Sequence, residues 1–257
     1  MLKKIILLLF ISSLVYAKDY ALSIGIDNGG LKGASNDAKE LKDFLQKRGV
    51  RVISLYNKDA TKERILTNLQ QTIKNMSSGD RLYLFYSGHG TNSFDPFNRN
   101  RPKVKEILQD TGALIPWDID SSDYARGLII SKRDLVPLFK QLEEKRIETV
   151  VMIDACFAGE SYKSFGNTNN TNLKNISFFY KQRSKEVVYP YKYITYICAS
   201  TRSDYTAESS SKHRGYFSMD LIECLKKHKH LNGLRVCMRE SKLPSIVLPK
   251  TGDRKIL

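Results

Sequence analysis

The sequence predicts an α/β fold in which a mostly parallel sheet of about six strands carries helices on both faces. Short apolar runs alternate with amphipathic stretches, and several of the runs are apolar on both faces, as buried parallel strands are. The chain has 257 residues, of which 41% are hydrophobic and 27% charged, so it belongs to the folded globular class. This composition excludes disordered, collagen-like and disulfide-scaffold proteins.

The first βαβ unit occupies residues 20–55. An apolar strand over 20–26 precedes a helix and a second strand over 50–55. Asp37, followed three residues later by Glu40, is a capping signal for the start of that helix, and Gly49 is typical of its end. Its apolar face carries Ala38, Leu41, Phe44 and Leu45.

A second helix and a central strand follow. The helix ends at 77–80, and residues 81–86 form a run that is apolar on both faces. The helix face is made of Ile65, Leu69, Ile73 and Met76.

The second half continues the same alternation. Short extended pieces over 112–116 and 127–130 suggest a hairpin, and Ser131 with Asp134 forms a capping box before a helix that Pro137 shortens or kinks. The later elements expected are strands over 149–153 and 193–199, a helix over 216–227, and a long irregular loop over about 159–192. We expect one domain over residues 18–257.

Residues 1–17 are typical of an export signal. A short basic start precedes an apolar run over 5–15, and Val15 and Ala17 place short residues at the −3 and −1 positions. The run is shorter than the roughly 20 residues that span a bilayer. We therefore expect cleavage before Lys18, export to the periplasm or the medium, and no stable membrane anchor afterwards. A retained anchor is the alternative.

The formal net charge is +15, from 42 basic and 27 acidic residues. Such a charge attracts polyanions. The basic residues are spread along the chain without a dense run, so we expect a generally cationic surface and no specific nucleic-acid partner. A polyanion-binding protein is a further interpretation that rests on net charge alone.

The four cysteines lie in the second half, at Cys156, Cys198, Cys224 and Cys237. They form no CxxC pair, and no histidine stands at metal-ligand spacing, so we expect no zinc site. If one cysteine is a nucleophile, one internal disulfide at most can form. Cys224 with Cys237 is a candidate pair that the spacing leaves open.

Two strands end in reactive side chains. The run 81–86 leads into Ser87-Gly88-His89-Gly90, and the run 149–153 leads into Asp154-Ala155-Cys156. Because carboxyl ends of parallel strands meet at one edge, we expect these segments to lie together. A histidine activates a thiol near neutral pH, so we predict His89 as general base and Cys156 as nucleophile. Backbone N–H groups of Gly90 and Cys156 are expected to form the oxyanion hole.

Asp154 stands two residues before the nucleophile and faces the same side of the strand. A carboxylate there disfavours the thiolate. We interpret it as the receptor of a positively charged substrate side chain. Two alternatives stay open, in which Asp154 orients His89 or caps backbone amides.

Taken in order, seven blocks of the sequence resemble the caspase-like cysteine peptidases, in the bacterial and metacaspase-type branch of a clan shared with legumain, gingipain and clostripain. The blocks are residues 21–26, 31–38, 86–90, 114–118, 154–159, 199–204 and 215–218. The resemblance implies a caspase-like three-layer α/β/α sandwich and a Cys156–His89 endopeptidase. It also implies cleavage after Arg or Lys, with Asp154 and Asp204 as substrate-binding acids in the pocket.

The same resemblance bears on calcium and activation. Many metacaspase-type enzymes need calcium, and Asp118, Asp120 and Asp123 form a small acidic cluster, but they lack the spacing of an EF-hand, so we expect a solvated loop. Acyl transfer through a thioester requires no cofactor. Related enzymes are cut in the loop after the nucleophile, and self-cleavage there is a hypothesis. The basic residues of that loop are Lys174, Lys181, Arg183 and Lys185.

A second class of function remains open. The chain could keep the fold without activity and act as a binding module in the cell envelope. The intact pair of His89 and Cys156 favours the peptidase.

Overall fold

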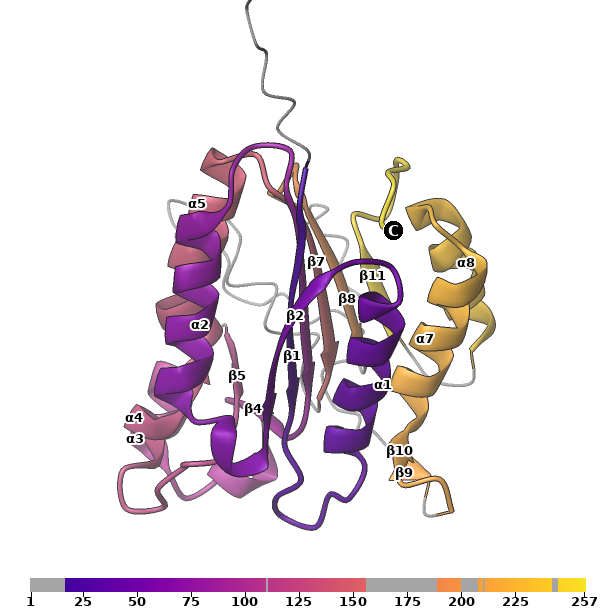
Figure 1. Cartoon of the computed structure of the whole chain (residues 1–257). Coiled ribbons are helices and arrows are strands. Elements are labelled where there is room, and N and C mark those ends of the chain that lie inside the picture. Colours follow the sequence, from indigo (N-terminus) through magenta and orange to yellow (C-terminus); the bar gives the residue numbers. More distant parts are fainter. Residues whose placement is uncertain (1–16, 110, 156–188, 200–207, 210, 242–244) are drawn as a thin grey trace, which may run out of the picture.

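A six-stranded sheet forms the centre of the chain (Figure 1). The computed structural model describes residues 17–109, 111–155, 189–199, 208–209, 211–241 and 245–257. The strand order is β11-β8-β7-β3-β1-β2, with β11 antiparallel and the other five parallel. This confirms the expected sheet. The strands are β1 (Asp19–Gly25), β2 (Arg51–Tyr56), β3 (Arg81–Ser87), β7 (Glu148–Asp154), β8 (Ile194–Ala199) and β11 (Ser245–Leu248).

Helices cover both faces of this sheet, which makes three layers (Figure 1). On one face lie α2 (Lys62–Asn75) and α5 (Val136–Glu144), and on the other lie α1 (Ala34–Gln46), α7 (Tyr216–Lys227) and α8 (Leu231–Glu240). Each face has its own buried cluster, and β3 supplies alternate residues to both. Tyr86 packs in the first cluster and Phe85 in the second. The run 81–86 is apolar on both faces for this reason.

The first helix begins four residues earlier than the capping signal predicts, because its N-cap is Gly33 and not Asp37. It starts at Ala34, and the Asp27 carboxylate, which follows β1, accepts the Ser35 N–H at 3.0 Å. The cap therefore comes from outside the helix. Asp37 lies in the first turn of α1 and is fully buried.

A small antiparallel sheet packs beside the main one. The expected hairpin is present, because β5 (Gly112–Leu114) pairs with β6 (Ile129–Ile130), and β4 (Gly90–Asn92) adds a strand that the sequence did not indicate. Short elements complete this part. They are 3-10 turns η1 (Asn57–Asp59) and η2 (Pro96–Asn98), and helices α3 (Pro102–Ile107) and α4 (Tyr124–Gly127).

The helix after this hairpin begins differently from the prediction. A π-helical turn, η3 (Ser131–Leu135), precedes α5, and Pro137 lies in the first turn of α5. Proline fits there because the first turn leaves backbone N–H groups without intrahelical partners. Asp134 accepts the Ile130 N–H at 2.8 Å, so the cap forms one residue earlier than the box at Ser131 predicts.

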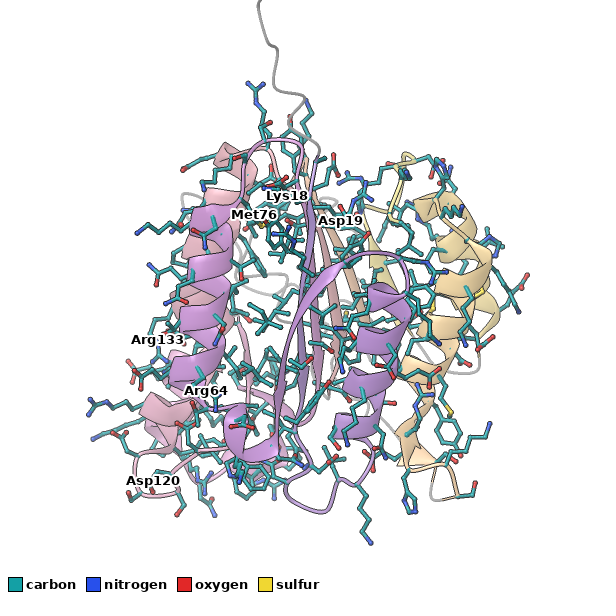
Figure 2. All side chains as sticks on the ribbon, viewed as in Figure 1. Lys18, Asp19, Arg64, Met76, Asp120 and Arg133 are labelled. Carbon is teal, nitrogen blue, oxygen red and sulfur yellow. A yellow bond between two sulfur atoms is a disulfide. The ribbon has the colours of Figure 1, made fainter. Side chains whose placement is uncertain are left out.

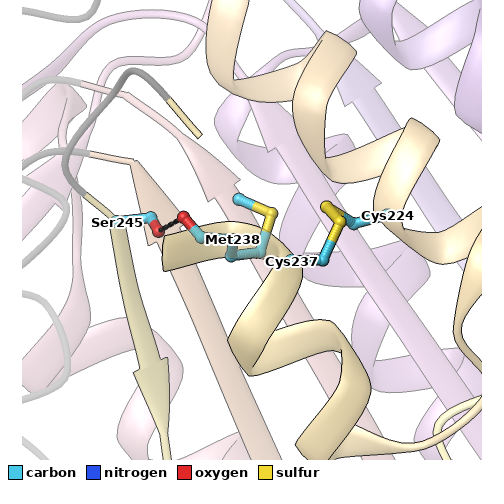
Figure 3. Close-up of a disulfide and its surroundings, with 4 residues drawn as sticks. All are labelled: Cys224, Cys237, Met238 and Ser245. Atoms are coloured by element: carbon cyan, nitrogen blue, oxygen red, sulfur yellow. Dashed lines mark hydrogen bonds between the residues drawn. A yellow bond between two sulfur atoms is a disulfide. The ribbon is translucent and has the colours of Figure 1, made fainter. Parts of the chain in front are cut away.

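A disulfide joins α7 to α8 (Figure 3). The Cα atoms of Cys224 and Cys237 lie 5.7 Å apart, which settles the pairing that the spacing left open. The next residue, Met238, accepts a hydrogen bond from the Ser245 hydroxyl at 3.3 Å, and Ser245 begins β11. The two helices and the edge strand are thus tied together.

The first described residues lie at the end of the molecule opposite the acidic loop, which carries Asp118, Asp120 and Asp123. Figure 2 labels Lys18 and Asp19 at that end and Asp120 at the other. The backbone N–H of Lys18 donates to Asp80 at 2.8 Å. The expected export signal covers residues that the structure does not describe. None of the described helices is long and apolar enough to cross a membrane.

We expect the disulfide to stabilise the folded chain. Replacing Cys224 and Cys237 together by Ser should lower the free energy of unfolding by about 2–4 kcal/mol, because a cross-link of this span restricts the unfolded chain. Urea unfolding measures the change. A reductant should destabilise the parent protein by a similar amount and leave the double variant unchanged; equal stability of the parent with and without reductant would contradict the prediction.

Candidate active site

The segments after β1 and β3 meet the end of β7 at the carboxyl edge of the sheet. The β9–β10 hairpin and the starts of α1 and α7 lie at the same edge (Figure 1), with β9 at Glu208–Ser209 and β10 at Arg214–Gly215. Two backbone hydrogen bonds connect these neighbouring segments. Ile26 N–H donates to Ser87 at 3.0 Å, and Gly88 N–H donates to Asp154 at 3.1 Å. The described parts of the two segments, Ser87 to Gly90 and Asp154 to Ala155, therefore share one edge, while Cys156 lies outside the described residues.

His89 is held at its backbone by the Tyr86 hydroxyl and at its ring by the Asn28 carbonyl. The buried Tyr86 hydroxyl lies 2.8 Å from the His89 carbonyl and 2.9 Å from that of Ile115, which holds the turn. On the ring, Nε2 lies 3.0 Å from the Asn28 carbonyl oxygen. A carbonyl only accepts, so Nε2 carries the proton and Nδ1 of the neutral ring is the proton acceptor.

Gly29 leaves room for this ring. A Cβ at position 29 would lie 2.8 Å from His89 Nε2, closer than side chains pack, and the residue has φ of +56°. Both features favour glycine. The neighbouring Gly30 has φ of +99° with nothing within 4 Å of such an atom.

Asp154, the last residue of β7, bonds to the start of α7. One carboxylate oxygen accepts the Ser218 hydroxyl at 2.6 Å and the Ser218 N–H at 3.2 Å. The N–H belongs to the first turn of α7, so the carboxylate caps that helix from another strand. The side chain is buried, and desolvation raises its pKa to about 6.

Asp37 lies next to Asp154, although sequence indicated only a cap. A Cβ at Gly215 would lie 2.3 Å from an Asp154 oxygen and 2.9 Å from Asp37 Oδ2. Asp37 Oδ2 accepts the Gly215 N–H at 2.9 Å and the Ser87 hydroxyl at 3.2 Å. Burial, and then the nearby Asp154 charge, raise the pKa of Asp37 to about 7. In the sequence, its place inside the block 31–38 was the available signal.

The remaining predicted residues fall into two groups. Gly90 is described and is the buried first residue of β4. Cys156 and Asp204 lie outside the described residues, as do Lys174, Lys181, Arg183 and Lys185. The described free thiol, Cys198, is buried in β8, and burial raises its pKa well above the ordinary value, so it is not an activated nucleophile.

The acidic loop does not fit a calcium ion. The Asp118 carboxylate accepts the Lys62 N–H at 2.8 Å, and Asp120 accepts the Ser122 hydroxyl at 2.7 Å. Lys62 and Arg126 line the same hollow as these acids and Asp123. Within the described ranges, no group of three or more His, Cys, Asp or Glu side chains could hold a metal ion. We derive no metal-dependent step.

Comparisons with known sequences agree on one family. Residues 18–242 match the family model of the caspase domain. Metacaspase-2 of Trypanosoma brucei brucei is 29% identical over 154 residues, 54% of this chain and 41% of that protein. Metacaspase-1 of Mycosarcoma maydis is 32% identical over 91 residues, 30% of this chain and 23% of that protein. The chain thus spans less than half the length of these relatives.

Two crystal structures share the fold. Protein GSU0716 of Geobacter sulfurreducens aligns with a TM-score of 0.60 at 18% identity, over 90% of this chain and 93% of that one. Caspase-1 of Spodoptera frugiperda aligns with a TM-score of 0.51 at 14% identity, over 86% and 74%. At such identities they support the fold alone. They confirm the expected caspase-like three-layer arrangement.

We expect Gly29→Ala to displace the His89 ring, because the added methyl group would meet Nε2. The NMR signals of the ring nitrogens should then lose the pattern of a single Nε2–H tautomer. Gly30→Ala is the control, since that position also has a positive φ, of +99°, but an added Cβ there would meet no neighbouring atom. Identical ring spectra for Gly29→Ala and the parent protein would show that the contact does not position His89.

Proposed function

This chain belongs to the caspase domain family, and from that membership we propose that it is an exported cysteine endopeptidase that cleaves peptide bonds after Arg or Lys. The observation that carries the proposal is the position of His89 at the carboxyl edge. Its Nε2 is held by a backbone carbonyl, so Nδ1 is the base, and β7 ends there two residues before Cys156. The cell compartment would be the periplasm or the medium.

The proposed reaction is acyl transfer. His89 Nδ1 takes the proton of the Cys156 thiol, and the thiolate attacks the scissile carbonyl carbon. The new oxyanion accepts hydrogen bonds from the backbone N–H groups of Gly90 and Cys156. His89 then gives the proton to the leaving amine, and water hydrolyses the thioester to release the carboxylic acid and the thiol. The chemistry requires no cofactor.

A preference for basic substrates follows from the charge near the nucleophile. Asp154 and Asp37 place two carboxyl groups beneath Gly215, and Asp204 is proposed as a further pocket acid. The pKa of Asp154 is raised to about 6, so most of this group is ionised above that pH. A cationic side chain bound nearby would offset the repulsion between the acids. Substrates are therefore proposed to be peptides or proteins with Arg or Lys.

The loop after Cys156 is a candidate for self-cleavage. The proposed specificity fits its basic residues, which are Lys174, Lys181, Arg183 and Lys185. Incubation of the chain from Lys18 onward should yield fragments that end at one of these residues, and Cys156→Ala should stay intact, as mass spectrometry would show. Identical fragments from both proteins would exclude self-cleavage.

The activity itself is tested with fluorogenic peptides that end in Arg, Lys or Asp. We expect cleavage after Arg and Lys, reduced at least about 1,000-fold in Cys156→Ala and in His89→Ala, since each removes half of the reacting pair. Cys198→Ala is the matched control and should keep the parent rate, because that thiol is buried and inert.

Cleavage only after Asp would contradict the role of the acidic residues. If no peptide is cleaved, even after the long loop has been nicked with trypsin, the chain is a binding module with a caspase fold.

A further inference from the structure

Arg214 is the cation that faces the buried carboxylate pair. Its Nε donates to Asp37 Oδ1 at 2.9 Å, and its Nη1 pairs with Glu40 on the next turn of α1. The Arg214 side chain is 16% exposed and that of Asp37 is 0% exposed. In the described part of the chain, no other basic side chain forms an ion pair with Asp37 or Asp154.

The surroundings of the pair are mainly acidic. Burial, and then the Asp154 charge, raise the pKa of Asp37, while the Gly215 N–H and Arg214 lower it. The Glu208 charge raises the pKa of Asp154 further. Lys226 reaches Glu40 at 3.7 Å, and Glu40 separates it from the pair. The charged groups that interact with Asp37, Asp154 or Arg214, directly or through Glu40, come from five elements. They are Glu40 (α1), Asp154 (β7), Glu208 (β9), Arg214 (β10), and Glu223 and Lys226 (α7).

We propose that Arg214 determines specificity by keeping Asp37 ionised next to Asp154, so that the pocket retains the negative charge that a basic substrate side chain requires. The inference rests on the proposed function and adds a residue to it. Arg214 acts through Asp37, so it is a positioning residue and has no contact with the substrate.

The geometry favours this role over direct competition with the substrate. Arg214 bonds Asp37 Oδ1, whereas Oδ2 is the oxygen near Gly215 and Asp154. The guanidinium extends from Asp37 toward Glu40, along α1. It therefore supports the carboxylate without covering the side that faces Asp154. The buried carboxylate acts on a bound cation through its charge, which is weakly screened in the protein interior.

The test measures peptide binding in the Cys156→Ala background, which prevents cleavage. One fluorescent peptide has arginine before the scissile bond, and its partner has citrulline, a neutral side chain of the same shape. Four proteins are compared. They are the Cys156→Ala protein and three derivatives of it that also carry Arg214→Gln, Arg214→Lys or Lys226→Gln. Lys226→Gln is the matched control because Lys226 binds Glu40 but not Asp37.

At pH 7 we expect Arg214→Gln to weaken binding of the arginine peptide at least about fivefold, since an adjacent opposite charge moves a carboxyl pKa by roughly one pH unit or more. Binding of the citrulline peptide should not change. Arg214→Lys should restore part of the affinity. Lys226→Gln should behave like the background protein.

The pH dependence of peptide binding distinguishes a loss of carboxylate charge from a structural change in the pocket. A carboxylate attracts the cation only while ionised, so binding is lost as the pH falls through its folded pKa. Without Arg214 that pKa is higher, and the loss should begin at a pH about one unit higher or more. The affinities of the two proteins should converge near pH 9.5, where arginine keeps its charge.

Three results with the Arg214→Gln protein would overturn the inference. They are an unchanged affinity and pH midpoint in Arg214→Gln, equal weakening of both peptides, and tighter binding of the arginine peptide. A background protein that binds both peptides equally at every pH would overturn it too. Cleavage of the arginine peptide by the wild-type protein is measured separately. Failure to cleave with the binding pattern intact would contradict the proposed function alone.

Discussion

Burial of Asp37 and Asp154 beneath the backbone of Gly215 is the constraint on which the carboxyl edge of the sheet depends. The three residues come from α1, β7 and the boundary of β10 with α7. A methyl group at position 215 would lie 2.3 Å from the Asp154 carboxylate, so glycine is required for space. Gly215 has φ of −65°, an ordinary value. The contact therefore fixes how closely α7 approaches the sheet.

The same edge gathers the positive ends of two helix dipoles. Asp27 caps α1 and Asp154 caps α7; Asp154 is the last residue of β7, and Asp27 lies two residues after the end of β1. Helix N-termini stabilise negative charge, which offsets part of the cost of burying carboxylates there. A sheet whose strands run parallel thus brings strand ends, helix starts and acidic side chains to one place. Charge-dependent chemistry is favoured at that edge for this reason.

The sequence predicts what depends on local pattern and misses what depends on distant contacts. The run 81–86 indicates a buried strand because β3 packs against helices on both faces. The start of α1 was misplaced because its cap, Asp27, lies outside the helix. Strands of two or three residues, such as β4 and β9, are too short for a period. Asp37 is a buried neighbour of Asp154 only through the fold.

The hydrogen bonds of His89 and Asp154 divide their roles. The Asn28 carbonyl orients His89, while Ser218 engages Asp154, so among these contacts the carboxylate serves α7 and not the imidazole. A neutral carbonyl stabilises an imidazolium less than a carboxylate would. In the proposed reaction, a cysteine thiol would need less support than a serine hydroxyl, because its ordinary pKa of about 8.5 is close to neutral. The positive end of α7 also offsets part of the Asp154 charge, which would otherwise oppose a thiolate two residues away.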